Sequence, residues 1–180
     1  MINRVIFYFV IGSFVGWIFE IICKTLAGED KSRAGMAQCP FCILYGIGTC
    51  FMSMYISEYK NNILTIFVFS SIILTTLEYI TGVLLENIYG IELWDYRKLK
   101  FGINKYISLE FVIIWGVIGV IFIKYILPAL NKMYLLFYGT ELILIIYIVL
   151  LYILINYISI TIRLLSKKKL WGYIIWYTIC

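Results

Sequence analysis

Long apolar runs separated by short charged stretches constrain the fold of this chain more than any other feature of its sequence. Of its 180 residues, 63% are hydrophobic and 14% are charged, whereas a soluble domain carries about 25% charged residues. A membrane-spanning helix needs about 20 consecutive, mostly apolar residues. The sequence therefore predicts an all-α, polytopic transmembrane helical bundle. It has about five spans, the second being the shortest, at residues 5–25, 41–57, 62–85, 107–127 and 137–162.

The chain outside these runs is too short for a separate soluble domain. We expect residues 1–162 to form one transmembrane helical domain, and residues 163–180 to form a basic and aromatic tail at the membrane surface. In that tail, Lys167, Lys168 and Lys169 would lie among the lipid headgroups. The lipid bilayer is thus the expected partner, and the net charge of +5 needs no nucleic acid to explain it. No cleavage-site pattern follows the first run, so we expect that span to be retained.

The distribution of Lys and Arg predicts the orientation in the cell membrane, because basic residues concentrate on the cytoplasmic side. With five spans, eleven of the fifteen lie on one side and four on the other. The eleven are Lys24, Lys31, Arg33, Arg97, Lys98, Lys100, Lys105, Arg163, Lys167, Lys168 and Lys169. The N-terminus is therefore expected outside and the C-terminus in the cytoplasm, although Arg4 at the N-terminus favours the opposite arrangement.

Four glutamates lie within the apolar runs: Glu20, Glu78, Glu110 and Glu141. A carboxylate at membrane depth costs about 2.5–3.5 kcal/mol by insertion scales, so it usually faces a bundle interior or a wet cavity. We expect Glu20, Glu78 and Glu110 to line a polar interior or substrate path. Glu141 is expected only to mark the membrane edge. The rival interpretation is structural, because Glu20 precedes Lys24 by one helical turn.

The carboxylates of Glu20 and Glu78 are also expected to approach each other or to share a partner, since both lie on polar faces of spans that run in parallel. Two carboxylates in one apolar site cannot both ionise cheaply, so one would hold its proton. The third span presents its polar side chains on one face. That face comprises Ser71, Thr75, Glu78, Gly82 and Glu86.

Small residues mark the expected contacts between helices. Gly12 and Gly16 have the spacing that lets another helix approach closely. Gly46, Gly82 and Gly116 are assigned the same packing role. Aromatic–glycine pairs recur in the second and fourth spans, at Tyr45-Gly46 and Trp115-Gly116, so the chain shows a weak parallel two-span repeat followed by a fifth helix.

The longest connection, residues 87–106, is expected to cap the cytoplasmic side. Loops of this length are usually functional or tightly packed. The capping residues are expected to be Trp94, Asp95, Tyr96 and Asn104, with Asp95 bound to Arg97 or to a helix end.

Four blocks of residues between Gly12 and Gly119 resemble a known family, the small bacterial integral membrane proteins grouped as ABC-transporter type IV permeases. The blocks are Ser13-x-x-Gly16-Trp17-x-x-Glu20, the run from Pro40 to Gly48, Leu77-Glu78-Tyr79-x-Thr81-Gly82, and Leu93-Trp94-Asp95-Tyr96 continuing through Asn104 and Leu109 to Trp115-Gly116. The resemblance implies a transporter permease working with a separate ATP-binding subunit. It adds Trp17 and Tyr45 to the expected substrate path.

The chain itself contains no Walker-type phosphate loop, so it is not the ATP-hydrolysing subunit of the P-loop type. Its small size makes a homodimer plausible. Two other functions remain open: a membrane enzyme acting on lipid or thiols, and a structural or regulatory membrane subunit.

Cys39 and Cys42 have the C-x-x-C spacing of redox proteins. Cys39 stands where the family pattern has glycine, and Ile43 where it has a second proline. The motif falls on the predicted cytoplasmic side, which is reducing, so we expect two reduced thiols. The chain has no histidine, and the other cysteines form no second pair. We therefore assign no metal site, no cofactor and no catalytic residue.

Overall fold

The computed structural model describes residues 2–26 and 39–179, and in this part of the chain the secondary structure is helical, with no strand. The predicted all-α bundle is therefore confirmed. Lys31 and Arg33, which entered the orientation prediction, lie outside the described residues, as do the side chains of residues 167–180 in the expected tail.

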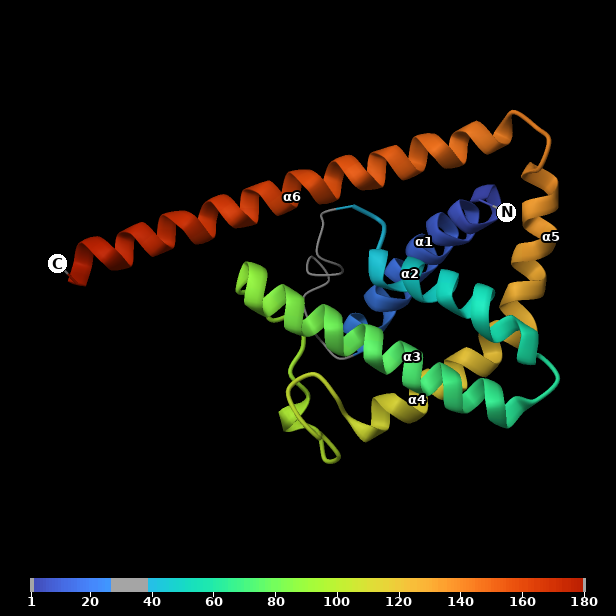
Figure 1. Cartoon of the computed structure of the whole chain (residues 1–180), viewed down its shortest axis with the longest axis horizontal. Helices are drawn as coiled ribbons and strands as arrows, with labels where there is room; N and C mark the ends of the chain where they lie inside the picture. Colours follow the sequence, from blue (N-terminus) through green and yellow to red (C-terminus); the bar gives the residue numbers. More distant parts are fainter. Residues whose placement is uncertain (1, 27–38, 180) are drawn as a thin grey trace.

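Four helical segments among the described residues are long and apolar enough to cross a membrane. They are α1 (Ile2–Leu26), α3 (Ile63–Leu84) with a π-helical turn (Leu85–Tyr89), α4 (Leu109–Ile121) with its continuation to Phe137, and most of α6 (Leu142–Ile179). The second predicted span is shorter. It comprises α2 (Ile43–Phe51), a π-helical turn (Met52–Ile56) and a 3-10 turn (Ser57–Tyr59). Figure 1 shows α1 and α3 running in one direction, with α2 and α4 running back.

Helix α3 has clear local signals at both ends. The side-chain oxygen of Asn62 accepts a hydrogen bond from the backbone N–H of Thr65 at 3.1 Å, which caps the first turn. At the other end the π-helical turn stops at Gly90, whose φ of 69° lies in the left-handed region that glycine adopts without a steric penalty.

Two helical hairpins, α1–α2 and α3–α4, are held together by small residues. A Cβ built on Gly46 would lie 2.1 Å from the hydroxyl oxygen of Ser13, and one built on Gly116 would lie 2.4 Å from that of Ser71. Each hairpin thus places a serine of its first helix against a glycine of its second. A further glycine contributes to each hairpin. In the first hairpin Gly12 of α1 faces Thr49 of α2, and in the second hairpin Gly119 of α4 faces Ser70 of α3.

The fourth segment bends after α4. A π-helical turn (Phe122–Ile126) leads into α5 (Leu127–Phe137), which has Pro128 in its first turn. Proline is tolerated at a helix start, and helices kink at π-helical turns and prolines. Figure 1 shows α5 turned across the end of the bundle that holds the N-terminus. There the hydroxyl of Tyr8 in α1 donates a hydrogen bond to Asn131 in α5.

The apolar core lies at this same end of the molecule. Its largest members come from α1, α3, α5 and α6 and from the turns that follow α2 and α4. Phe7, Ile66 and Ile153 are completely buried, and Ile56 is nearly so. The opposite end of the bundle, reached by the C-terminal part of α3, is covered by the loop that joins α3 to α4, residues 91–108, which we call the 3–4 connection (Figure 1). The polar and apolar halves of the bundle are therefore separated along its length.

Candidate functional site: the Glu78 cavity

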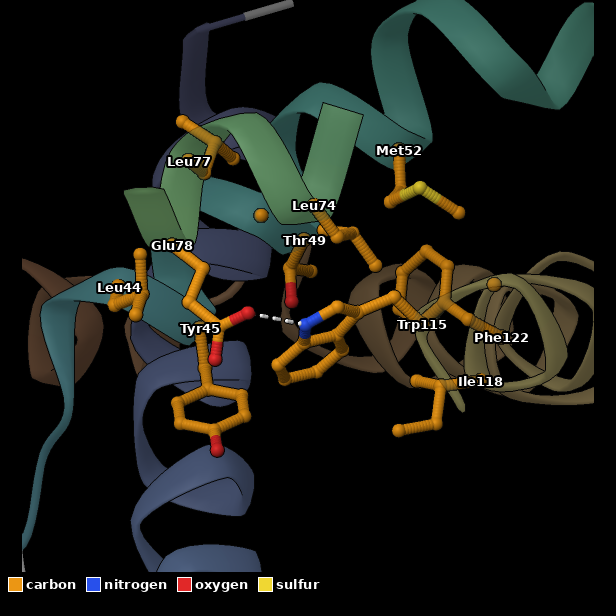
Figure 2. A pocket seen from close by; sticks show the side chains of 12 residues that line it. Leu44, Tyr45, Thr49, Met52, Leu74, Leu77, Glu78, Trp115, Ile118 and Phe122 are labelled. Atoms are coloured by element: carbon orange, nitrogen blue, oxygen red, sulfur yellow. Dashed lines mark hydrogen bonds between the residues drawn. The ribbon is translucent and has the colours of Figure 1, made fainter. Parts of the chain in front are cut away.

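Glu78 is the most deeply buried of the four glutamates in the apolar runs, with 4% of its surface exposed. Its Oε1 accepts a hydrogen bond from the Tyr96 hydroxyl at 2.6 Å. Its Oε2 accepts one from the Trp115 indole N–H at 2.8 Å, which Figure 2 draws as a dashed line. The carboxylate of α3 is thus held by the 3–4 connection on one side and by α4 on the other.

A cavity of about 80 Å³ borders this carboxylate. Twelve residues of α2, α3, α4 and the adjoining π-helical turns line it; Glu78 is the only carboxylate among them, and none of them is basic. Tyr45 of α2 and Trp115 of α4 are both lining residues, and their ring centroids lie 6.2 Å apart. Figure 2 shows the Glu78 carboxylate between these two aromatic side chains. The remaining lining residues are Leu44, Gly48, Thr49, Met52, Leu74, Leu77, Ile118, Gly119 and Phe122.

The 3–4 connection positions Tyr96 through a short 3-10 turn (Tyr96–Lys98). Asp95 caps this turn by accepting a hydrogen bond from the Arg97 backbone N–H at 3.0 Å. It also forms an ion pair of 2.8 Å with the Arg97 guanidinium. The Tyr96 ring stacks on Phe111 of α4, with centroids 4.5 Å apart. Burial, together with the neighbouring Glu78 carboxylate, raises the pKa of Tyr96. Tyr96 therefore stays protonated and able to donate to Glu78.

Asn104 shapes the other side of the same connection. Its side-chain oxygen accepts hydrogen bonds from the backbone N–H groups of Tyr106 and Ile107, at 2.8 and 2.9 Å. Trp94 and Tyr106 come close to Gly82 of α3, where an added Cβ would lie 2.6 Å from the Tyr106 ring and 3.3 Å from Trp94. The four residues predicted to form the cap therefore lie in one folded loop against the end of α3.

A second polar cluster, centred on Glu86, fixes this loop about two helical turns beyond Glu78. The Lys105 ammonium lies 2.6 Å from Glu86 and 2.5 Å from Glu92, and the Tyr106 hydroxyl donates to Glu86. The two carboxylates raise the pKa of Lys105, Glu86 contributing most. Sequence reasoning placed Glu86 on the polar face of its span but missed Lys105 and Tyr106 as its partners. No local sequence signal pairs residues this far apart in a loop.

Glu20 has a different environment from Glu78. It forms an ion pair of 3.6 Å with Lys24 one turn later in α1, as the structural interpretation predicts. Within the described part of the chain there is no hydrogen bond or ion pair between Glu20 and Glu78, although Tyr45 interacts electrostatically with both. Trp17 stacks on Phe14 of its own helix. Tyr45 lies against Gly16, where an added Cβ would come within 2.2 Å of its side chain.

Glu110 and Glu141 lie away from the cavity. Glu110 is in the first turn of α4 and accepts a hydrogen bond from the Ser108 hydroxyl at 3.1 Å. Glu141 is exposed in the turn before α6. The lining of the cavity therefore includes Glu78 and Tyr45 from the predicted path, together with Trp115 from the family blocks, and leaves out Glu20, Glu110 and Trp17.

The C-x-x-C pair lies just before α2. Both cysteines are free and buried, and the Cys42 backbone N–H donates to the Ser13 carbonyl at 2.9 Å. Burial raises the pKa of the Cys39 thiol. Such a thiol is a poor nucleophile at neutral pH. No group of three metal-ligating side chains occurs among the described residues.

Comparison with known proteins identifies one family. The model of the family described as "Putative ABC-transporter type IV" matches residues 7–174. No curated protein and no solved structure matches the chain. The matched range contains the cavity, the loop whose Tyr96 donates to Glu78, and all the helices that line the cavity.

Proposed function

Because the chain belongs to this ABC-transporter type IV family, we propose that it is the membrane-spanning, permease-like component of a transport system. The Glu78 cavity lies in the substrate path, and the loop from residue 91 to residue 108 caps that path on the cytoplasmic side. ATP hydrolysis is supplied by a separate ATP-binding subunit, since the chain carries no Walker-type phosphate loop.

One observation carries the proposal: a buried carboxylate inside an apolar membrane helix borders a cavity and is bound by two different segments. Ionisable residues at membrane depth are costly and usually mark substrate or ion pathways. A purely structural carboxylate would need only its hydrogen-bond partners. Glu78 has those partners, from Tyr96 and Trp115, and in addition a cavity of about 80 Å³.

The loop is suited to act as a movable cap. Its polar side-chain contacts to α3 and to the π-helical turn after α3 are the hydrogen bond of Tyr96 to Glu78 and the contacts of Lys105 and Tyr106 to Glu86. Each is a side-chain contact that can break without unfolding a helix. Release of Tyr96 would free one oxygen of Glu78, which lines the cavity.

The membrane orientation and assembly belong to the same proposal. The termini lie at opposite ends of the structure (Figure 1), as expected for an N-terminus outside and a C-terminus in the cytoplasm. The loop end would then face the cytoplasm, where an ATP-binding subunit is available. We propose a homodimer as the working unit, because one bundle of this size offers only a small path.

The test is affinity purification of the full chain from its native membranes, followed by identification of the proteins that remain bound. A copurifying ATP-hydrolysing subunit is expected. Glu78→Gln, which keeps the side-chain shape and removes the charge, should abolish transport by that complex, whereas Glu141→Gln should not. A chain that purifies without any ATPase, with Glu78→Gln fully active in cells, would exclude the transport role.

A further inference from the structure

The charge of the Glu78 cavity is not balanced by any residue that lines it. One carboxylate is present and none of the twelve lining residues is basic. Its two hydrogen bonds come from a phenol and an indole, which are neutral donors. A buried carboxylate without a positive partner costs several kcal/mol. An occupant that brings a positive charge is therefore favoured in this cavity over a neutral or anionic one.

The aromatic residues narrow the chemistry of that occupant. The indole N–H of Trp115 donates to Glu78, so the edge of this ring is used on the acid. The ring of Tyr45 lies 6.2 Å away, inclined by 62° to the indole. Faces of Trp and Tyr attract cations within about 6 Å, and quaternary ammonium groups are recognised in this way.

The oxygen atoms that line the cavity are too few for a metal ion, and the volume of the cavity is too small for a large organic cation. A hard metal ion requires several oxygen ligands, and the lining offers only the carboxylate of Glu78 and the hydroxyls of Tyr45 and Thr49. The other walls are apolar and match alkyl groups. The cavity of about 80 Å³ is well below the roughly 300–1,000 Å³ of sites that hold drug-sized ligands. The occupant must therefore be small.

From these observations we propose that the Glu78 cavity binds a small organic monocation of the alkylammonium class. Glu78 supplies the counter-charge, Tyr45 and Trp115 supply aromatic faces, and Leu74 and Ile118 are among the residues that enclose the alkyl groups. The proposal rests on the proposed transport role, for which it names the substrate class. Its test is a binding measurement that does not require transport.

The experiment is equilibrium dialysis of radiolabelled tetramethylammonium against the purified full chain in lipid nanodiscs. Saturable binding is expected. Unlabelled neopentyl alcohol, which has a similar shape and no charge, should fail to displace it at concentrations where unlabelled tetramethylammonium does. Glu78→Gln should weaken binding at least 10-fold. Tyr45→Leu should weaken it between about 2- and 30-fold, the range of a single cation–π contact. The matched control Glu141→Gln should bind as the parent chain does.

Three results would overturn the proposal: no saturable binding, equal displacement by neopentyl alcohol, or unchanged binding by folded Glu78→Gln. If Glu78→Gln does not fold, two other measurements decide. They are whether neopentyl alcohol displaces tetramethylammonium from the parent chain, and whether Tyr45→Leu weakens binding. The transport role fails separately. Binding of tetramethylammonium by a chain that has no ATPase partner supports the ligand class and rejects the transport role. An ATPase complex that does not bind the cation does the reverse.

Discussion

Glu78 accepts hydrogen bonds from residues that lie 18 and 37 positions later in the chain. Periodicity within α3 shows that such a residue faces the protein interior, since Ser71, Glu78 and Gly82 share one face. It contains no information about which side chains meet it there. The pairing with Tyr96 depends on a loop whose path is set by many contacts, among them the stacking on Phe111. Local sequence therefore identifies the acid but not its partners.

The hydrogen bond from Tyr96 leads to the first prediction. Tyr96→Phe removes the hydroxyl and leaves the ring on Phe111, so Glu78 loses one donor in a buried site. We expect a loss of about 1.5–3 kcal/mol in the free energy of unfolding, as for hydrogen bonds to charged groups. The thermal midpoint of Tyr96→Phe in detergent should be lower than that of the control Tyr125→Phe, because Tyr125 is 73% exposed. Equal midpoints for the two variants would contradict this prediction.

The Asp95–Arg97 pair leads to a prediction about pH. The Arg97 side chain, which contributes most, and its backbone N–H hold the pKa of Asp95 well below its usual range. A carboxyl with a lowered pKa in the folded state contributes stability above its unfolded pKa of about 3.9, and this is lost as the pH falls through the folded value. The capped turn should therefore persist at neutral and mildly acid pH. A carbon NMR titration of Asp95 should show a midpoint that rises towards 3.9 in Arg97→Gln; the same midpoint in both chains would refute the assignment.

The apolar runs of the sequence predicted where the helices lie, but they did not predict where two of the helices end. The fourth and fifth spans were expected at residues 107–127 and 137–162, whereas the structure continues the fourth to Phe137 and carries α6 from Leu142 to Ile179. The apolar run that predicted the fourth span ends at residue 127, directly before Pro128. In the structure, Pro128 lies in the first turn of α5, where proline is compatible with a helix. Hydropathy locates the membrane-embedded part of a helix and does not determine where the helix stops.

The contact between α3 and α4 gives a prediction at the level of elements. A Cβ on Gly119 would lie 2.1 Å from both Cβ and Oγ of Ser70. Gly119→Ala should therefore push the two helices apart and lower the free energy of unfolding by about 1–3 kcal/mol, the usual cost of overpacking. Adding Ser70→Gly removes the clashing atoms and should restore part of the loss. The thermal midpoints of the single and double variants measure this; a double variant less stable than the Gly119→Ala chain would show that the contact is not the cause.

At the level of the whole molecule, the two ends of the bundle differ in chemistry. The end with α5 holds the apolar core, which includes Phe7, Leu127 and Tyr134. The other end carries the ionic cluster of Lys105, Glu86 and Glu92. The cavity lies between the two, beside the boundary that Glu78 marks. An opening at the loop end would break polar contacts and leave the core intact, so transport would require little unfolding.

The orientation of these ends in the membrane is the last prediction. With five spans, eleven of the fifteen Lys and Arg residues are expected on the loop side and four on the other, which predicts that the loop lies in the cytoplasm. In a chain whose own cysteines have been replaced by serine, we introduce Ile2→Cys or Lys100→Cys and treat intact cells with a membrane-impermeant thiol reagent. Ile2 is 72% exposed and Lys100 lies in the exposed part of the loop, so both sites can react. Ile2→Cys should be labelled in intact cells and Lys100→Cys only after the membrane is opened. The reverse pattern would place the loop outside, away from ATP, and would contradict both the orientation and the proposal that the loop end faces an ATP-binding subunit.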